Sequence, residues 1–524
     1  MTKKEKLFKS NIVPSVLLIL TVIGAILFRA SRSNWVFIGT AVGFNALPVT
    51  LLCLMAVCAA LLGIYLRLKL TDNAFCQKKI CRAVFVITTV FSVILILFSF
   101  IYAIGLAVSE SGEVFVLHLK QTLAEGALLV TVAFFTLFYP LLSLKAKKTV
   151  AVISVAAVIL FGFNEFYPLS SYKITSTPMV IDNGKEYSIV FSTSYQGTAW
   201  AEYTYNGKDY KVYDHTGGRK KGDSNIHSIS VPYDHLRNNS YKVGSTRVIE
   251  EFSYGSRTGK TVTSLEYDFK YNDSNDQRWL VISDWHTQVD KASQAVNNLA
   301  SDYDGVILLG DASPGVDFEQ QVITNTVQFG GRVSGGTRPV LYVRGNHETR
   351  GAYAKDLPVA LGIEQFYYTT DIGPYSFIVL DSGEDKDDSH IEYGGMTDYN
   401  TYRADMIDWL KGTEVKNDKV IALSHSWEIS EVEEELSLSG WAELDRLGTR
   451  AFLSGHEHQC RFIGDREGKE KELNEKYPDI IGYVDGGKVG EAYVANLLTL
   501  NENSFKIYAI DNNGNVFTDE KFEW

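Results

Sequence analysis

The sequence predicts a multi-domain protein, in which a five-helix transmembrane region precedes a small all-β sandwich and then an α/β domain. Three observations support this order. The chain has 524 residues, which is too long for one ordinary domain. Residues 1–150 carry a charge balance of +10, whereas residues 151–524 carry −22. Long apolar stretches fill the first part, short alternating strands follow, and from about residue 278 apolar strands alternate with helical patterns. We place the domains at 1–166, 170–275 and 278–524.

The first domain contains five apolar stretches that are long enough, or nearly so, to cross a bilayer, which takes roughly 20 residues. They are Ile12–Phe28, Ala46–Leu66, Ala83–Val108, Gly126–Leu144 and Thr149–Phe166. Lysine and arginine gather before the first stretch, between the second and third, and between the fourth and fifth. Such basic loops stay in the cytoplasm. The pattern therefore predicts a multi-pass protein with a cytoplasmic N-terminus, and it places the chain beyond about residue 167 outside the cell.

Composition narrows the compartment and the partners. The chain has five cysteines, and Cys460 is the only one beyond residue 81, so no disulfide framework is expected in the later domains. Sparse cysteine and basic inner loops favour a bacterial plasma membrane. The acidic balance of residues 151–524 argues against a nucleic-acid partner, which would need a basic face. No charge pair lies within a span, which favours a plain anchor over a transporter with an accessory domain.

The second domain, residues 170–275, has the pattern of short strands. Tyr187, Ile189 and Phe191 alternate with polar residues, and turn signals such as Asn183-Gly184 recur. Strands this short, separated by such turns, are typical of a sandwich of about a hundred residues. The stretches TAWAEYTYNG and HSISVPYDHLRNNSYKVGSTRV resemble a fibronectin type III-like domain.

In the third domain, five apolar strands each end in a side chain that can bind metal. These side chains form the ordered series Asp284-x-His286, Asp311, Asn346-His347, His425 and His456-x-His458. Loops at the carboxyl ends of strands in an α/β sheet meet in one crevice, so these side chains are expected to converge. Carboxylate, imidazole and amide oxygen suit divalent first-row metals, and alternation along an extended segment puts both ends of each x-spaced pair on one face. The series therefore predicts a two-metal site.

The series DxH, GD, GNHE, H and GHxH resembles the calcineurin-like metallophosphoesterase family, which includes the purple acid phosphatases. The resemblance covers about residues 278–524 and implies a four-layer α/β/β/α core. YVDGG, YVANLLTL and SFKIYAI are interpreted as strands of its second sheet. It also implies a membrane-anchored, outward-facing hydrolase that cleaves phosphate mono- or diesters by attack of a metal-bridging hydroxide.

The resemblance further implies a role for each side chain of the series. Seven are expected to be ligands: Asp284, His286 and His458 for one metal ion, Asn346, His425 and His456 for the other, and Asp311 for both. His347 is expected to be catalytic rather than a ligand, since it would stabilise the phosphoryl oxygens or protonate the leaving alkoxide. Glu348, which flanks the motif, is interpreted from its position as a residue that supports the site or begins a helix rather than as a ligand.

Two departures from the family pattern limit what is carried over. Purple acid phosphatases have a tyrosine ligand shortly after the bridging aspartate and lack the histidine present here as His286, so the two divalent ions are expected to be Mn, Fe or Zn. Many members also have an Asp or Asn three residues after the bridging aspartate, in contact with the catalytic histidine. Pro314 occupies that position here, and Asp317 is one possible substitute.

The substrate is left open by the sequence. A small molecule, a nucleotide or a lipid head group would each supply a phosphoester. The acidic loop at 381–395 either rims the pocket or is simply solvated, and we favour the solvated loop. The alternative from another functional class is a catalytically silent extracellular binding or receptor module that keeps the same fold.

Overall fold

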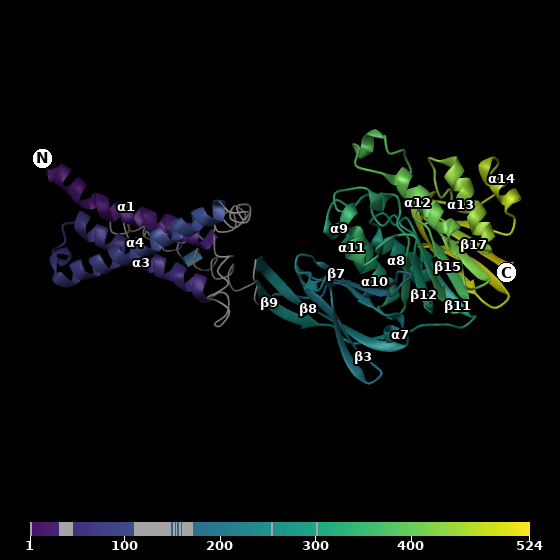
Figure 1. Cartoon of the computed structure of the whole chain (residues 1–524), viewed down its shortest axis with the longest axis horizontal. Helices are drawn as coiled ribbons and strands as arrows, with labels where there is room; N and C mark the ends of the chain where they lie inside the picture. The colour runs from purple at the N-terminus through teal and green to yellow at the C-terminus, as the bar shows by residue number, and fades with distance from the viewer. Residues whose placement is uncertain are drawn as a thin grey trace. The chain divides into compact units, whose positions relative to one another are not determined.

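The computed structural model describes residues 3–30, 46–108, 171–252, 255–299 and 302–524, with isolated residues between 148 and 159. The chain divides into two compact units (Figure 1). One comprises Met1–Ser171 with Val248–Lys260, and its N-terminal part is helical. The other comprises Tyr172–Arg247 and Thr261–Trp524, and it contains both the β region and the α/β region.

The N-terminal region consists of long apolar helices, α1 (Lys3–Ala30), α3 (Ala46–Leu70) and α4 (Lys79–Val108). They pack against one another, and Phe28 and Met55 are buried in the cluster between them. Many other apolar side chains of α4 are exposed. An exposed apolar helix surface is stable in contact with lipid rather than water.

The prediction of five spans is corrected by the described residues. Among them, one helix, Lys79–Ile101, is long and apolar enough to cross a membrane. The apolar part of α1 runs only from Pro14 to Phe28, which is shorter than the roughly 20 residues a span requires. The predicted spans Gly126–Leu144 and Thr149–Phe166 fall outside the described residues, apart from isolated positions in the latter. In the part of the chain described, the multi-pass prediction therefore reduces to one candidate anchor.

Two sheets form the centre of the second unit. Among the described residues, the first sheet has the order β23-β22-β21-β11-β12-β13-β1-β2-β7, with β20 beside β21, and the second has the order β14-β15-β16-β17-β19-β18. The first sheet comprises β1 (Met179–Asp182), β2 (Tyr187–Ser192), β7 (Ile226–Val231), β11 (Gln277–Ile282), β12 (Gly305–Leu308), β13 (Pro339–Tyr342), β20 (Lys488–Val489), β21 (Ala492–Leu500), β22 (Ser504–Asp511) and β23 (Val516–Glu523). The second comprises β14 (Tyr368–Ile372), β15 (Tyr375–Val379), β16 (Lys419–Leu423), β17 (Thr449–Ser454), β18 (Cys460–Phe462) and β19 (Ile481–Asp485).

The apolar runs of the sequence become buried parallel strands. β11, β12 and β13 run parallel to one another, as do β15, β16, β17 and β19. Parallel strands are covered on both faces, which explains runs without polar alternation. Trp279 and Val281 of β11 belong to the core between the two sheets, whereas Leu280 and Ile282 belong to the core on the opposite face.

Helices cover the outer faces of both sheets (Figure 1). The first sheet packs against α8 (Val289–Asn298), α10 (Gln328–Ser334) and α11 (Leu357–Leu361), with α9 (Glu319–Val322) nearby. The second packs against α12 (Tyr399–Lys411), α13 (Glu434–Arg446) and α14 (Lys469–Lys476). The second unit therefore contains helix, sheet, sheet and helix layers.

The β region shares a sheet with the α/β region. β1 pairs in parallel with β13, so β1, β2 and β7 extend the first sheet. They pack face to face with β3 (Gly197–Tyr205), β4 (Lys208–Tyr213), β10 (Tyr267–Phe269) and the first part of β8 (Asn239–Phe252). β9 (Gly255–Thr263) pairs with β8, and β5 (His215–Thr216) and β6 (Arg219–Lys220) form a small ribbon. The arrangement is sandwich-like, and the fibronectin type III-like assignment stays a prediction.

The predicted positions of two C-terminal strands are wrong. YVANLLTL and SFKIYAI form β21 and β22, which belong to the first sheet rather than the second. β21 pairs antiparallel with β11. Sequence could not decide this, because the apolar pattern of a strand does not say which neighbour it pairs with. YVDGG does belong to the second sheet, as the end of β19.

Buried His227 in β7 is expected to make the second unit sensitive to acid. Its Nε2 lies 2.9 Å from Thr193 Oγ1, and Asp214 Oδ2 lies 4.0 Å from its Nδ1. Burial, with a smaller effect of Lys221, lowers the pKa of His227 from 6.5 to about 3. Below pH 6.5 the unfolded chain therefore binds a proton that the folded chain does not bind until about pH 3, so stability falls across this window. In thermal melts from pH 7 to 4, His227→Gln should lose less stability on acidification than wild type. An equal loss would contradict this.

Candidate metal centre

The seven side chains predicted to bind metal, together with His347, lie just beyond the carboxyl ends of five strands. Asp284 and His286 follow β11, Asp311 follows β12, Asn346 and His347 follow β13, His425 follows β16, and His456 and His458 follow β17. The two sheets face each other, so both sets of loops reach the same edge. The structure brings all eight side chains together.

Three of them form one group of possible ligands, namely Asp284, His286 and His458. His286 Nε2 lies 3.1 Å from His458 Nε2, and His458 Nε2 lies 3.4 Å from Asp284 Oδ1. Asp284 is buried, whereas the two imidazoles are partly exposed. These are the three residues expected to hold one ion, and that assignment stays a prediction.

A second group consists of Asp311, His425 and His456. His425 Nε2 lies 3.3 Å from Asp311 Oδ2, and His456 Nδ1 lies 3.3 Å from Asn346 Oδ1. Asp311 also belongs to a third group with His286 and His347. A carboxylate shared between groups is what a bridging ligand requires.

Two oxygen atoms at the site have surroundings that suit a bound cation better than a protein hydrogen bond. Asp284 Oδ1 is buried and accepts no hydrogen bond. The Asn346 oxygen faces only acceptors, which are supplied by Asp311, His425 and His456. In the absence of a cation, the amide would turn its nitrogen toward them. Carboxylate, imidazole and amide oxygen together suit divalent first-row metals, so the donor set fits a dinuclear metal site.

The backbone at the ligands adopts an unusual conformation. Asp284, His286, Asp311, His456 and His458 all have positive φ, between 38° and 70°. The left-handed region costs a non-glycine residue roughly 1–2 kcal/mol. Such residues gather at functional sites, where the surrounding structure holds them in place. Here the turned backbone directs side chains from the strand ends into the shared edge.

Electrostatics favours ionised carboxylates at the centre. Burial alone would raise the pKa of Asp311, but His425 and His347 outweigh burial and hold it below its ordinary value. Asp284 likewise has a lowered pKa, because His425 and His458 outweigh burial. Ionised carboxylates are the form that binds metal.

His347 is held by a backbone carbonyl. Its Nδ1 donates to Pro314 O at 2.9 Å, and its backbone N–H donates to Asp311 Oδ1 at 3.0 Å. The backbone carbonyl of Pro314 therefore holds the His347 ring, a role that many family members give to an Asp or Asn side chain. Asp317 is not the partner of His347 Nδ1. The Nε2 atom is left 3.8 Å from Asp311 Oδ2, on the side of the metal centre.

Glu348 supports the loop around Asp311, as expected. It is fully buried, and its carboxylate accepts hydrogen bonds from the backbone N–H groups of Asp311, Ala312 and Gly345, at 2.8, 2.6 and 2.9 Å. Burial, reinforced by Asp311, raises the pKa of Glu348 to about 7. Glu348 thereby ties the loop after β12 to the loop after β13.

Gly345 is required because another chain segment passes very close to it. A Cβ at this position would lie 2.2 Å from Asp311 Oδ1 and 2.4 Å from Asp311 N. Gly345→Ala should therefore displace Asp311, weaken metal binding at least tenfold, and destabilise the unit by roughly 1–3 kcal/mol, as overpacking does. Metal titration and thermal melts would measure both effects. Gly412→Ala is the matched control, because a Cβ there meets its nearest atoms at 3.6 Å. Equal metal affinity in both variants would contradict the expectation.

Sequence reasoning missed several residues that position the ligands. The Ser283 hydroxyl bridges Asp284 Oδ2 and the buried carboxylate of Asp485. Glu431 Oε1 lies 3.1 Å from His456 Nε2. Asp485 belongs to a strand pattern and Glu431 to an acidic loop, and neither carries a motif that would reveal its role.

The acidic loop at 381–395 is only partly solvated. Glu384 within it is buried and binds Arg350 through two hydrogen bonds of 2.7 and 2.5 Å. The favoured interpretation as a simply solvated loop is therefore wrong for Glu384. Arg350 and Glu384 are 34 residues apart in the sequence, and no sequence pattern indicates that they pair.

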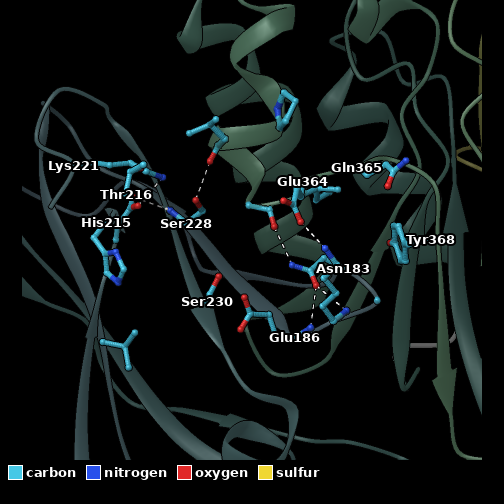
Figure 2. Close-up of a pocket in the computed structure, with 18 of the residues that line it drawn as sticks. Asn183, Glu186, His215, Thr216, Lys221, Ser228, Ser230, Glu364, Gln365 and Tyr368 are labelled. Carbon is cyan, nitrogen blue, oxygen red and sulfur yellow. Dashed lines mark hydrogen bonds and ion pairs between the residues drawn. The ribbon is translucent and has the colours of Figure 1, made fainter. Parts of the chain in front are cut away.

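A cavity of about 720 Å³ lies elsewhere in the second unit, and none of the predicted ligands lines it. Figure 2 shows Asn183, Glu186, Ser228, Ser230, Glu364 and Gln365 among the residues that line this cavity. Its lining includes few charged groups that lack partners, since Lys185 pairs with Glu364 and Lys221 with Asp214. The candidate metal ligands therefore lie at the strand ends rather than in this cavity.

Comparisons with known proteins agree with the site. A family model described as calcineurin-like phosphoesterase matches residues 278–460. No curated protein matches the chain.

Among solved structures, "Structure of PhoD" is 9% identical, with 66% of this chain and 94% of that chain covered, at a TM-score of 0.38. GAP50 of Plasmodium, described as the anchor in the inner membrane complex, is 15% identical, with coverages of 48% and 89% and a TM-score of 0.33. A cold-active protein-tyrosine phosphatase of Shewanella is 14% identical, with coverages of 67% and 99% and a TM-score of 0.27. Likenesses this distant carry no argument about function.

The family match spans the first four motifs and GHxH, and it ends at Cys460, two residues after His458. The same residues supply the clustered aspartates and histidines. Residues 278–460 are therefore a calcineurin-like metallophosphoesterase domain.

Proposed function

We propose that this protein is a membrane-anchored, metal-dependent phosphoesterase that hydrolyses phosphate mono- or diesters. The observation that carries the proposal is the convergence of two aspartates, an amide oxygen and imidazoles at one edge, where Asp284 Oδ1 accepts no hydrogen bond and the Asn346 oxygen faces acceptor atoms. A purely structural cluster would have satisfied these buried oxygens with hydrogen bonds.

The proposed ligand assignment follows the two groups. Asp284, His286 and His458 would hold one ion, Asn346, His425 and His456 the other, and Asp311 both. Two divalent ions (Mn, Fe or Zn), when bound, lower the pKa of water and stabilise charge on the attacking and leaving oxygens. Asp311 is suited to both ions because it lies near His286 on one side and His425 on the other.

His347 is proposed to move the proton that hydrolysis requires. Breaking the ester P–O bond leaves an alkoxide that needs a proton, while the attacking water loses one. Pro314 O fixes the His347 ring, so Nε2 faces the centre. In its protonated form, Nε2 can donate to a phosphoryl oxygen or to the leaving oxygen. Its place in a group with Asp311 and His286 reflects this proximity and does not require it to be a ligand.

We also propose that α4 anchors the protein in a bacterial plasma membrane. Basic residues lie just before or at the start of the apolar span, namely Arg67, Lys69, Lys78, Lys79 and Arg82. The positive-inside rule keeps this end in the cytoplasm and supports an outward-facing catalytic region. Trypsin added to intact cells should remove a C-terminal epitope, and protection of that epitope would contradict the proposed orientation.

The test of the proposed activity uses the full chain in detergent. It is loaded with Mn, Fe or Zn and assayed with p-nitrophenyl phosphate and bis(p-nitrophenyl) phosphate, before and after a chelator. Hydrolysis of at least one ester that is lost with chelator and restored by metal is expected. Folded, metal-loaded protein that hydrolyses neither ester would favour the silent binding module instead.

A further inference from the structure

Arg350 occupies an unusual place beside the metal centre. It follows the GNHE motif by two residues, and its side chain is about one-quarter exposed. Its Nε and one terminal nitrogen bind Glu384, and the same terminal nitrogen reaches Asp385 at 2.9 Å. In the described part of the chain, the other terminal nitrogen, NH1, contacts no carboxylate. It lies 3.5 Å from each ring nitrogen of His347.

The carboxylates hold Arg350 rather than block it. Glu384 is buried, and it is fixed by Thr349 Oγ1 at 3.2 Å and through its backbone carbonyl by Arg403. Asp385 is also paired with Lys386 at 3.0 Å. These contacts use one edge of the planar guanidinium. The edge nearest His347 remains able to donate to an anion.

The side-chain amide of Asn346 lies beside the other edge of the same guanidinium. When its oxygen faces the metal cluster, its amide nitrogen lies 3.0 Å from Arg350 NH2, the nitrogen that already binds Glu384 and Asp385. NH1 is therefore the nitrogen available to an added anion. Arg350 NH1 lies 3.5 Å from His347 Nε2, so an anionic oxygen bound by NH1 would lie beside the His347 ring at the metal centre.

We propose that Arg350 binds a terminal phosphoryl oxygen of the substrate and makes the site select phosphate monoesters over diesters. This inference rests on the proposed function and names its substrate class. A monoester dianion has three terminal oxygens and two charges, whereas a diester has two such oxygens and one charge. An arginine, with its fixed planar donors, stabilises the more highly charged phosphate more strongly.

The test compares wild type with Arg350→Met and Arg350→Lys, using Arg332→Met on α10 as the control. Arg332 is a half-exposed surface arginine paired with Asp290. Binding of inorganic phosphate to the metal-loaded full chain is measured by calorimetry, beside kcat and KM for both nitrophenyl esters and the metal content. Arg350→Met should weaken phosphate binding about tenfold or more, the size expected for a charge-assisted hydrogen bond.

Selectivity distinguishes this role from a structural one. Arg350→Met should lower kcat/KM for the monoester at least tenfold more than for the diester, with metal content unchanged, and Arg350→Lys should recover part of the loss.

Unchanged phosphate affinity, or equal losses for both esters, would overturn the inference. Wild type that hydrolyses only the diester would overturn it and leave the proposed function intact. Wild type that hydrolyses neither ester, but binds phosphate through Arg350, would sustain the anion site and refute the proposed activity.

Discussion

His347→Ala is expected to keep both metal ions and to lose about 10²–10⁴-fold in turnover, the range for removal of a general acid. The ring is held by Pro314 O on one side and directs Nε2 to the centre on the other. Its loss removes a proton donor without removing any proposed ligand. Metal content and kcat of the purified variant measure the two effects separately.

Asn346→Ala is the matched comparison, because it alters the adjacent residue. The variant should lose metal, because the Asn346 oxygen faces acceptor atoms of Asp311, His425 and His456. A bound cation would bring these atoms together. Turnover should fall with metal occupancy and recover partly at high metal concentration. If the two variants behave identically in both assays, the division between ligand and proton donor is wrong.

Asp311→Asn is expected to have the largest effect of any single substitution. The side chain keeps its volume but loses the charge that lies between His286 and His425. Asp311 is buried and within 3.8 Å of His286, His347 and His425. Removing one partner of a buried charged network leaves the others uncompensated, which costs roughly 3–5 kcal/mol. Binding of both ions should weaken by at least a hundredfold, and turnover should become undetectable.

Metal titration by calorimetry measures the effect of Asp311→Asn, and Asp302→Asn serves as control. Asp302 has a mostly exposed side chain, paired with Arg278 on the surface. The control should bind metal as wild type does. If Asp311→Asn retains two tightly bound ions, Asp311 does not bridge them.

The catalytic fold could be predicted from sequence because its strands are short apolar runs that end in polar residues. β11, β12 and β13 lie close to where those runs predicted them, and the carboxyl ends meet at one edge. The pattern of ligand types therefore followed from local sequence together with one rule about sheets. The family resemblance supplied the division between two ions, which remains part of the proposal.

Features that depend on pairing across the chain could not be predicted. The pairing of β1 with β13 joins segments about 160 residues apart and merges the β region with the α/β region in one sheet. Asp284 and Asp311 have positive φ values, which the sequence did not reveal, because only a small share even of aspartates adopts that conformation. The hydrogen bond from His347 to the Pro314 carbonyl could not be predicted either. Every residue has a backbone carbonyl, and no sequence motif marks the one that is used.

Among the described residues, the prediction of a membrane span in α1 is wrong for a different reason. Apolar length alone does not separate a span from a shorter apolar helix that packs on its neighbours. In α1 the charged first turns and Pro14 leave a stretch of only Pro14–Phe28, and its buried residues contact α3 and α4. Helix α4 combines sufficient length with an exposed apolar surface, and it stays the candidate anchor among the described residues.

The central claim is that this chain holds two divalent metal ions at the shared edge of its two sheets. The most direct measurement is the metal-to-protein ratio of the full chain by mass spectrometry, after loading with Mn, Fe or Zn and removal of free metal. We expect a ratio close to two for wild type. Under the same conditions, Asp311→Asn should retain little or no metal. A wild-type ratio near zero with all three metals, in folded protein, would contradict the account.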